Sequence, residues 1–358
     1  MKKYYFLLAS ILPYLLFSQD AQPLPQGIQE QQSEIPLKTP EQIQQELTED
    51  EALFKRAQEM FNPWYTGPLL TPSATMMAPG YGNIQPYIFV TDTYAAYNND
   101  RKSVSLPSNK VSLNPQIGGV FGVTDTMDIS IALQAFGNWQ YGTSGGGFGD
   151  ISVKLGWPIL RQTLHLPAIK FSLSQTFPTG RYQKLNPHNH NLSATGGGVW
   201  ATQFGLAISK VMFWSYNHPL NARLYVGYTV SVPSTVHGFN TYGGGYGARA
   251  KVHPGNALIA DLGLEWSLTQ NWVISNDLVY TCQNKTTFSG NPGTLADGRT
   301  PSTEASPYND SLSLAPALEY NFSPNLGILG GVWFTVYGKN SANFISGILS
   351  VSWVFGPM

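Results

Sequence analysis

Residues 82–355 alternate between apolar and small or polar types in stretches of strand length, and this alternation constrains the fold more than any other feature. In residues 127–140, Ile131 and Leu133 fall on one side of a strand and Ser130 on the other, because successive side chains of a strand face opposite sides of its sheet. One face of each strand is therefore apolar and the other polar.

Twelve such stretches can be placed, and the connections between them are alternately short and long. Barrels that span an outer membrane have short periplasmic turns, longer outer loops and an even number of strands. The sequence therefore predicts an all-β fold: a transmembrane antiparallel up-and-down β-barrel of about 12 strands, with both chain ends on the periplasmic side. Residues 244–252 are assigned to an outer loop or to the outer extension of a hairpin, since a thirteenth strand there would break the alternation. The expected strands are 82–97, 110–122, 127–141, 148–160, 167–177, 198–213, 220–234, 256–267, 271–283, 310–322, 325–338 and 343–355.

The composition agrees with strands that have one apolar face toward lipid. Charged residues make up 11% of the chain, fewer than a soluble surface needs, while the mean hydropathy is only -0.13. Residues 18–358 contain no apolar run long enough for a membrane helix. The net charge of -1 gives no basic footprint for nucleic acid. Cys282 is the single cysteine, which excludes a disulfide framework and a lipid-anchored cysteine.

The amino-terminal part predicts export and a short extension. Three residues with two lysines precede an apolar run over residues 4–17, and small and polar residues follow, as in a signal peptide cleaved near Ser18 or Ala21. The alternative is a buried helix of a soluble domain. Residues 22–81 then form a periplasmic extension with a weakly amphipathic helix over 40–61, which packs on or plugs the barrel, or else is disordered or binds a partner. Residues 62–82 are expected to be irregular chain leading into the barrel, which covers 82–358.

Aromatic residues gather near the ends of the expected strands. Amphipathic rings at strand ends are typical of the two lipid headgroup levels of a membrane barrel. The alternative is the aromatic core of a soluble sandwich, which would not explain the scarcity of charge. These residues are Trp139, Tyr141, Trp157, Trp200, Trp266, Trp272, Tyr320, Phe322, Trp353 and Phe355.

Three segments in order resemble a known family. They are residues 122–133 (GVTDTMDISIAL), 147–155 (GFGDISVKL) and 168–180 (AIKFSLSQTFPTG). This order of a G-x-T-D turn, a GFGD strand start and a PTG strand end resembles the outer-membrane β-barrel family named for the meta-pathway of phenol degradation. The resemblance implies a transporter or channel for small molecules, including hydrophobic or aromatic ones. The chain departs from such barrels in its long proline-rich extension and in Phe355, which lies three residues before the end, whereas the assembly machinery commonly reads a terminal aromatic.

Motifs that could carry chemistry are weak. Three glycine triplets near 145, 196 and 243 lack the Lys-Ser/Thr and the strand-to-helix context of a phosphate loop, so they predict flexible outer loops. His188 and His190 could share a metal, but no further ligand lies nearby in the sequence, and a polar loop is the simpler interpretation. No pattern of a hydrolase or metalloprotease is present. We therefore expect no enzyme activity, no catalytic residue, no metal and no cofactor.

Charged residues on the polar faces of the strands are the candidate lining of the barrel lumen. A Lys or Arg facing lipid at the membrane midplane would cost about 2–4 kcal/mol, so the interior is the favoured side. Six of the nine are acidic, which favours a mildly cation-tolerant interior; alternatively, they pair with one another and fix a narrow barrel. The candidates are Asp128, Asp150, Lys154, Lys170, Arg223, Asp261, Glu265, Asp277 and Glu319.

Three functions are compatible with these features. The first is a channel or transporter that passes small solutes across the outer membrane of a Gram-negative-type bacterium. The second is a structural or adhesive barrel whose outer loops contact a host or another cell. The third is a membrane lipid hydrolase, which would need a His and a Ser on an outward-facing strand. The expected partners are outer-membrane lipid, a small-molecule solute and, during biogenesis, the barrel-assembly machinery, without nucleic acid.

Overall fold

The computed structural model describes residues 38–60, 63–189, 191–213, 218–299, 302 and 306–357. The predicted signal peptide, 1–21, and most of the extension up to residue 37 lie outside the described residues. The chain divides into a short unit, Met1–Ile43, and a main unit, Gln44–Met358, which contains the barrel.

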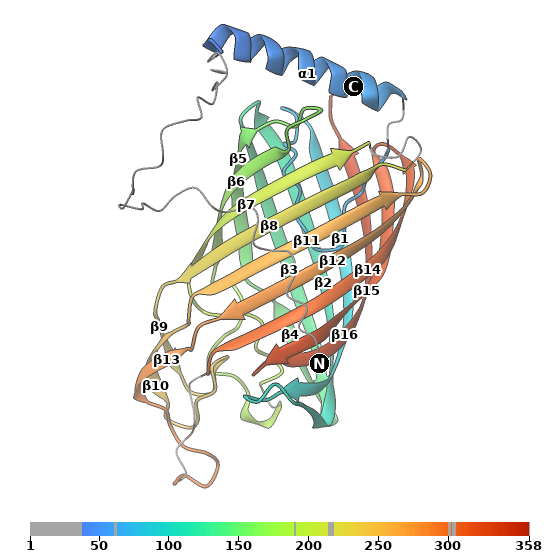
Figure 1. Cartoon of the computed structure of the whole chain (residues 1–358). Helices are drawn as coiled ribbons and strands as arrows, with labels where there is room; N and C mark the ends of the chain where they lie inside the picture. Colours follow the sequence, from blue (N-terminus) through green and yellow to red (C-terminus); the bar gives the residue numbers. More distant parts are fainter. Residues whose placement is uncertain are drawn as a thin grey trace, which may run out of the picture. The chain divides into compact units, whose positions relative to one another are not determined.

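The main unit is a closed antiparallel barrel of 12 strands (Figure 1). Strand β1 (Gly82–Tyr97) pairs on one side with β2 (Ser103–Thr124) and on the other with β16 (Ala342–Phe355), so the first and last strands close the sheet. The predicted fold class and strand number are confirmed, and each predicted span overlaps one barrel strand. The other strands are β3 (Met127–Gln140), β5 (Ile151–Leu160), β6 (Ala168–Phe177), β7 (Ala201–Met212), β8 (Leu220–Ser231), β11 (Ala257–Ser267), β12 (Trp272–Gln283), β14 (Asn309–Ser323) and β15 (Leu326–Lys339).

The long connections carry structure of their own at the outer end of the barrel. Strand β4 (Thr143–Phe148) extends the hairpin of β3. Strands β9 (Ser234–His237), β10 (Arg249–His253) and β13 (Thr287–Asn291) form a separate three-stranded sheet, in which Val236 of β9 and Val252 of β10 are fully buried. The loop expected at 244–252 thus contains a strand, which lies outside the barrel sheet as predicted. A short 3-10 helix (Pro187–Asn189) lies in the connection between β6 and β7.

The two faces of the barrel wall differ as period-2 geometry requires. In β11, Asp261 and Glu265 are buried, while the alternate residues Leu262 and Leu264 are exposed on the outer face. The same alternation runs through β12 and β16. An apolar outer face around a polar interior explains why so few charges suffice for this chain.

Aromatic side chains ring both ends of the outer face. At the end with short turns, Trp272 and Tyr320 are 4.7 Å apart between ring centroids, and Tyr320 contacts Phe322 edge to face. At the other end, Trp139 and Trp200 are about half exposed. Amphipathic rings in these positions match the two headgroup levels of a membrane.

Helix α1 (Pro40–Met60) lies within the predicted span 40–61, and residue 61 is outside the described residues. Asp50 accepts a hydrogen bond from the backbone N–H of His165 at 3.2 Å, in the turn between β5 and β6. The ring of Phe54 lies 6.0 Å from that of Phe213. The hydroxyl of Thr163 beside Asp50 holds the pKa of that carboxyl below its usual range. The helix therefore packs on the barrel through Asp50 and Phe54.

None of the helices in the described ranges is long and apolar enough to cross a membrane.

The first motif glycine, Gly122, is where the chain before β1 meets the end of β2. The backbone N–H of Gly80 donates to the carbonyl of Gly122 at 3.0 Å, and the N–H of Gly122 donates to Tyr81 at 2.9 Å. A Cβ at position 122 would overlap the carbonyl oxygens of Met77 and Ala78. Only glycine permits this close approach of two backbones.

We expect Gly122→Ala to destabilise the folded barrel by roughly 1–3 kcal/mol, because the segment before β1 must move away from β2. Gly347→Ala is the matched control: a Cβ there meets nothing within 4 Å. Alanine should be neutral or slightly stabilising at that position. Urea unfolding of both variants in lipid vesicles measures the difference, and equal midpoints would contradict the packing role of Gly122.

Candidate functional site

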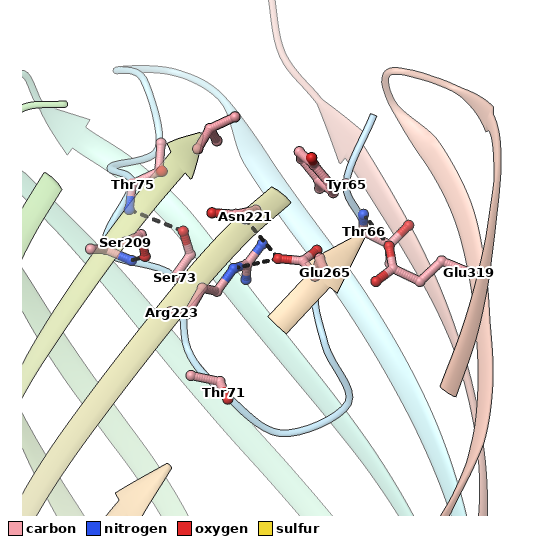
Figure 2. A network of polar contacts seen from close by, with 12 residues as sticks. Tyr65, Thr66, Thr71, Ser73, Thr75, Ser209, Asn221, Arg223, Glu265 and Glu319 are labelled. Carbon is pink, nitrogen blue, oxygen red and sulfur yellow. Dashed lines mark hydrogen bonds and ion pairs between the residues drawn. The ribbon is translucent and has the colours of Figure 1, made fainter. Parts of the chain in front are cut away.

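The barrel interior contains a segment of the chain's own extension. Residues 63–81, here called the inserted loop, enter among the strands, turn near Thr71 and return through Thr75 toward β1 (Figure 2). Leu69 at its centre is buried against Phe89, Ala315 and Leu329 on the inner wall. The sequence predicted irregular chain here, and the structure adds that this chain occupies the interior. The element that fills the barrel is thus the segment after helix α1.

Buried carboxylates hold the descending limb of the inserted loop. Glu319 on β14 accepts a hydrogen bond from the backbone N–H of Thr66 at 3.0 Å. Asp277 on β12 accepts from the N–H groups of Leu70 and Thr71 at 3.2 and 3.1 Å. The Thr71 hydroxyl also contacts Asp277 and, at 2.8 Å, Asp261 on β11. Irregular buried backbone has no sheet partner, so these carboxylates satisfy donors that would otherwise be unpaired.

An ion pair lies beside this limb. Arg223 on β8 and Glu265 on β11 are 2.8 Å apart between Nε and Oε2, and Asn221 donates to the same carboxylate at 2.7 Å. Gly67 passes directly over the guanidinium with φ +116°, and a Cβ there would lie 3.0 Å from Nη1. Figure 2 shows Glu319 next to Glu265. The Oε1 atoms of both glutamates are buried without a hydrogen-bond partner among the described residues.

The returning limb contacts the adjacent part of the wall, β7 and β6. The backbone N–H of Ala74 donates to the hydroxyl of Ser209 on β7 at 3.0 Å. Lys170 on β6 donates to the carbonyl of Thr75 at 3.3 Å and lies 3.4 Å from the carboxylate of Asp128 on β3. This lysine therefore links the loop to an acid of the wall.

A cavity of about 350 Å³ lies beside the returning limb at the end with short turns. Its lining is mostly apolar and includes Met76 and Met77 of the loop, Leu160 at the end of β5 and Phe54 of helix α1. Arg161 and Asp125 add charge. The inserted loop therefore leaves space along one side of this end of the barrel.

The other two sequence motifs meet at the outer end. Asp150, the last residue of GFGD, accepts hydrogen bonds from Gly180 of the PTG motif at 2.8 Å and from Gly197 at 2.7 Å. The hydroxyl of Thr179 donates to the carbonyl of Gly149 at 3.0 Å. Asp150 was predicted to line the lumen; in the structure it binds the outer loop 178–197.

The other eight predicted lumen residues lie on barrel strands, and their roles differ. Five carboxylates are buried and bonded to the loop or to a neighbouring cation: Asp128, Asp261, Glu265, Asp277 and Glu319. Arg223 is buried and pairs with Glu265, and Lys170 is partly exposed and pairs with Asp128. Lys154 on β5 has no hydrogen bond or ion pair with any described residue. Sequence reasoning missed Thr66, Thr71 and Lys110. Only Lys110 had a signal, because it shares strand parity with the polar residues Ser112 and Asn114.

The described histidines are in turns, in the 3-10 helix or in the small outer sheet. His165 and His218 flank barrel strands, His188 is in the 3-10 helix, and His237 and His253 end β9 and β10. His190, the possible partner of His188, lies outside the described residues. Within those residues, no group of three or more His, Cys, Asp or Glu side chains could hold a metal.

We expect Thr71→Val to lower the free energy of unfolding by about 1–3 kcal/mol. Valine keeps the shape of the side chain but removes the hydroxyl that contacts the two buried carboxylates. Ser73→Ala is the control within the same loop: among the described residues, the Ser73 hydroxyl accepts a hydrogen bond only from the nearby N–H of Thr75, at 3.0 Å. Urea unfolding in vesicles should show a clearly larger loss for Thr71→Val. A loss of the same size in both variants would show that the loop is not anchored at Thr71.

Comparison with solved structures gives one match that shows the same fold and others of lower similarity. An outer-membrane channel from Pseudomonas putida F1 superposes with a TM-score of 0.62, at 14% identity, over 80% of this chain and 100% of that chain, which shows a shared fold. The transport unit of the autotransporter AIDA-I from Escherichia coli scores 0.42 at 12% identity, covering 84% of this chain and 97% of that one. The P. putida toluene transporter TodX scores 0.37 at 14% identity, covering 83% and 96%. No curated protein matches the sequence of this chain.

The resemblance of the three motifs is confirmed over most of the sequence. The family described as "Putative MetA-pathway of phenol degradation" matches residues 89–342, from the middle of β1 to the start of β16. This range covers more than half of the chain and contains all three motifs. The chain belongs to this family of outer-membrane β-barrels.

Proposed function

We propose that this protein is an outer-membrane channel for small solutes, exported by the signal sequence at residues 1–21 and restricted by its inserted loop. The observation that carries the proposal is a closed barrel with a polar interior, in which hydrogen bonds rather than strand pairing hold the inserted loop. A structural barrel needs no such separable element in its interior. The family description adds aromatic compounds to the candidate solutes.

The loop's contacts are unevenly distributed around the wall. The polar contacts of its descending limb are with β8, β11, β12 and β14, or with the turns beside them. The returning limb touches the β2 and β6 strands near the end with short turns. The inner faces of β2, β3 and β5 farther from that end make no polar contact with the loop within the described residues. We infer that solutes pass along this uncovered wall and then beside the returning limb.

The adhesive alternative has one specific observation in its favour. The outer loops include an ordered three-stranded sheet with its own buried residues, which could present a binding surface. Exchange of residues 234–253 and 287–291 for short linkers should change binding to cells if adhesion is the function. It should leave solute flux intact if the barrel is a channel.

Outer-membrane lipid is the proposed partner of the apolar outer face, and Phe355 at the end of β16 is the proposed signal for the barrel-assembly machinery. The first proposal rests on the exposed aliphatic side chains of the outer face, and the second on the aromatic residue that ends the last strand.

We expect Asp277→Asn to raise solute flux through the barrel several-fold. The amide cannot accept both N–H groups of residues 70 and 71, and each lost bond to a charged acceptor weakens the loop by about 1.5–3 kcal/mol. Liposome swelling with small uncharged sugars and planar-bilayer conductance measure the flux. Asp100→Asn, in the exposed connection between β1 and β2, is the matched control and should match the wild-type protein.

The channel itself is tested in the same assays. A second variant, with residues 64–78 replaced by a short Gly-Ser linker, should conduct more than Asp277→Asn. The change in gel mobility on heating shows whether each barrel is folded. If the wild-type protein and both loop variants are folded by this measure but pass no solute and no current, the protein is not a channel.

A further inference from the structure

We propose that the channel prefers small organic anions, carboxylates above all, and that Lys154, assisted by Lys110, binds them on the wall that the inserted loop leaves uncovered. This proposal rests on the proposed channel function and adds the charge class of the solute.

The acidic residues of the interior are engaged with protein groups. Asp277 and Glu319 accept backbone N–H groups of the inserted loop, and Asp261 contacts the Thr71 hydroxyl. Glu265 is paired with Arg223, and Asp128 with Lys170. All five carboxylates are at most 1% exposed. A solute in the remaining space therefore meets none of them directly.

Lys154 is in the opposite situation. Its neighbours in register are Ser130 on β3 and Ser174 on β6, which places it on the inner face of the wall. No carboxylate within the described residues forms an ion pair with it, its side chain is partly exposed, and the charged groups that act on it are Lys170 and Asp128, which are bonded to each other. A cation in such a position attracts anions, because an unpaired charge inside a barrel is screened less than one on a surface.

Lys110 on β2 repeats this arrangement toward the outer end. It lies opposite Thr93 of β1 on the inner face and also has no ion pair among the described residues. Side-chain amides and hydroxyls occupy the wall between the two lysines: Asn114, Gln116, Ser130 and Gln134. Each of the three amide nitrogens donates one hydrogen bond within the protein, and its second N–H can donate to a carboxylate while the lysines supply the charge.

The charge preference therefore follows from which groups remain uncovered. Six acids and three bases were expected from the sequence, and that count favours cations. In the structure five acids are bonded within the protein and Asp150 binds the outer loop, so the uncovered wall presents lysines. Lysine or arginine rings are a general device for anion-selective pores. The interior contains more acidic than basic residues, but the groups that a solute can meet along the uncovered wall favour anions.

The first test is the reversal potential of the full-length mature protein in planar bilayers under a potassium chloride gradient, and then with potassium benzoate. We expect the wild-type protein to favour the anion. Lys154→Gln should lower the anion-to-cation permeability ratio about fivefold, which is the effect of one unit charge at contact distance in water. Lys154→Arg should keep the preference. Lys251→Gln, the same charge change on β10 of the outer sheet, should not alter it.

The second test needs no current. Ligand binding to the folded state raises its thermal stability, so sodium benzoate should raise the heat-unfolding temperature of the wild-type protein but not of Lys154→Gln. Benzyl alcohol, a neutral molecule of similar size, should raise it in neither protein. The unfolding temperature is read from the change in gel mobility after protein in vesicles has been heated to a series of temperatures.

The outcomes separate this inference from the channel proposal. Conductance with a cation preference, or with a ratio unchanged in Lys154→Gln, overturns the anion assignment and leaves the channel in place. Absence of conductance in every variant removes the channel, and the thermal shift then decides whether Lys154 binds carboxylates. Equal shifts in the wild-type protein and in Lys154→Gln, or no shift in either, overturn the site.

Discussion

The rest of this structure depends on one constraint, the hydrogen bonding of the backbone in a membrane. A strand in hydrocarbon must satisfy each N–H and C=O inside the protein, and only a sheet closed on itself leaves no open edge. The pairing of β1 with β16 provides that closure. Once the sheet is closed, every second side chain points into the interior, and that interior must be filled by polar partners, water or chain.

The inserted loop fills part of the interior, and its backbone forms hydrogen bonds with the acidic residues of the wall. A proline-rich segment without regular structure carries N–H groups that need acceptors, and carboxylates on β12 and β14 need donors. Each set would be unfavourable in the interior alone. Hydrogen bonds to charged groups contribute about 1.5–3 kcal/mol each, which is enough to order a loop and yet small enough to be broken singly.

The strands could be predicted from the sequence because a period of two is a local property, visible within about ten residues. The position of the inserted loop could not, because its contacts join residues far apart: Thr71 and Asp277 are separated by 206 positions. Residues 63–81 contain no periodicity that assigns them to the interior. Strand parity placed Asp277 and Glu319 on the inner face but gave no indication of their partners.

The motifs that identify the family act at the ends of the barrel. Gly122 allows the chain before β1 to approach β2, and Asp150 with Gly180 fastens an outer loop. These three residues are not on the uncovered wall of β2, β3 and β5, although the second motif segment, 147–155, continues into β5 and includes Lys154. The turn and strand-end motifs therefore specify how the barrel closes at its ends, whereas we infer that the solute is selected by side chains between them. For this chain we infer that the selection depends on Lys110 and Lys154, two cations that form no ion pair with any described residue.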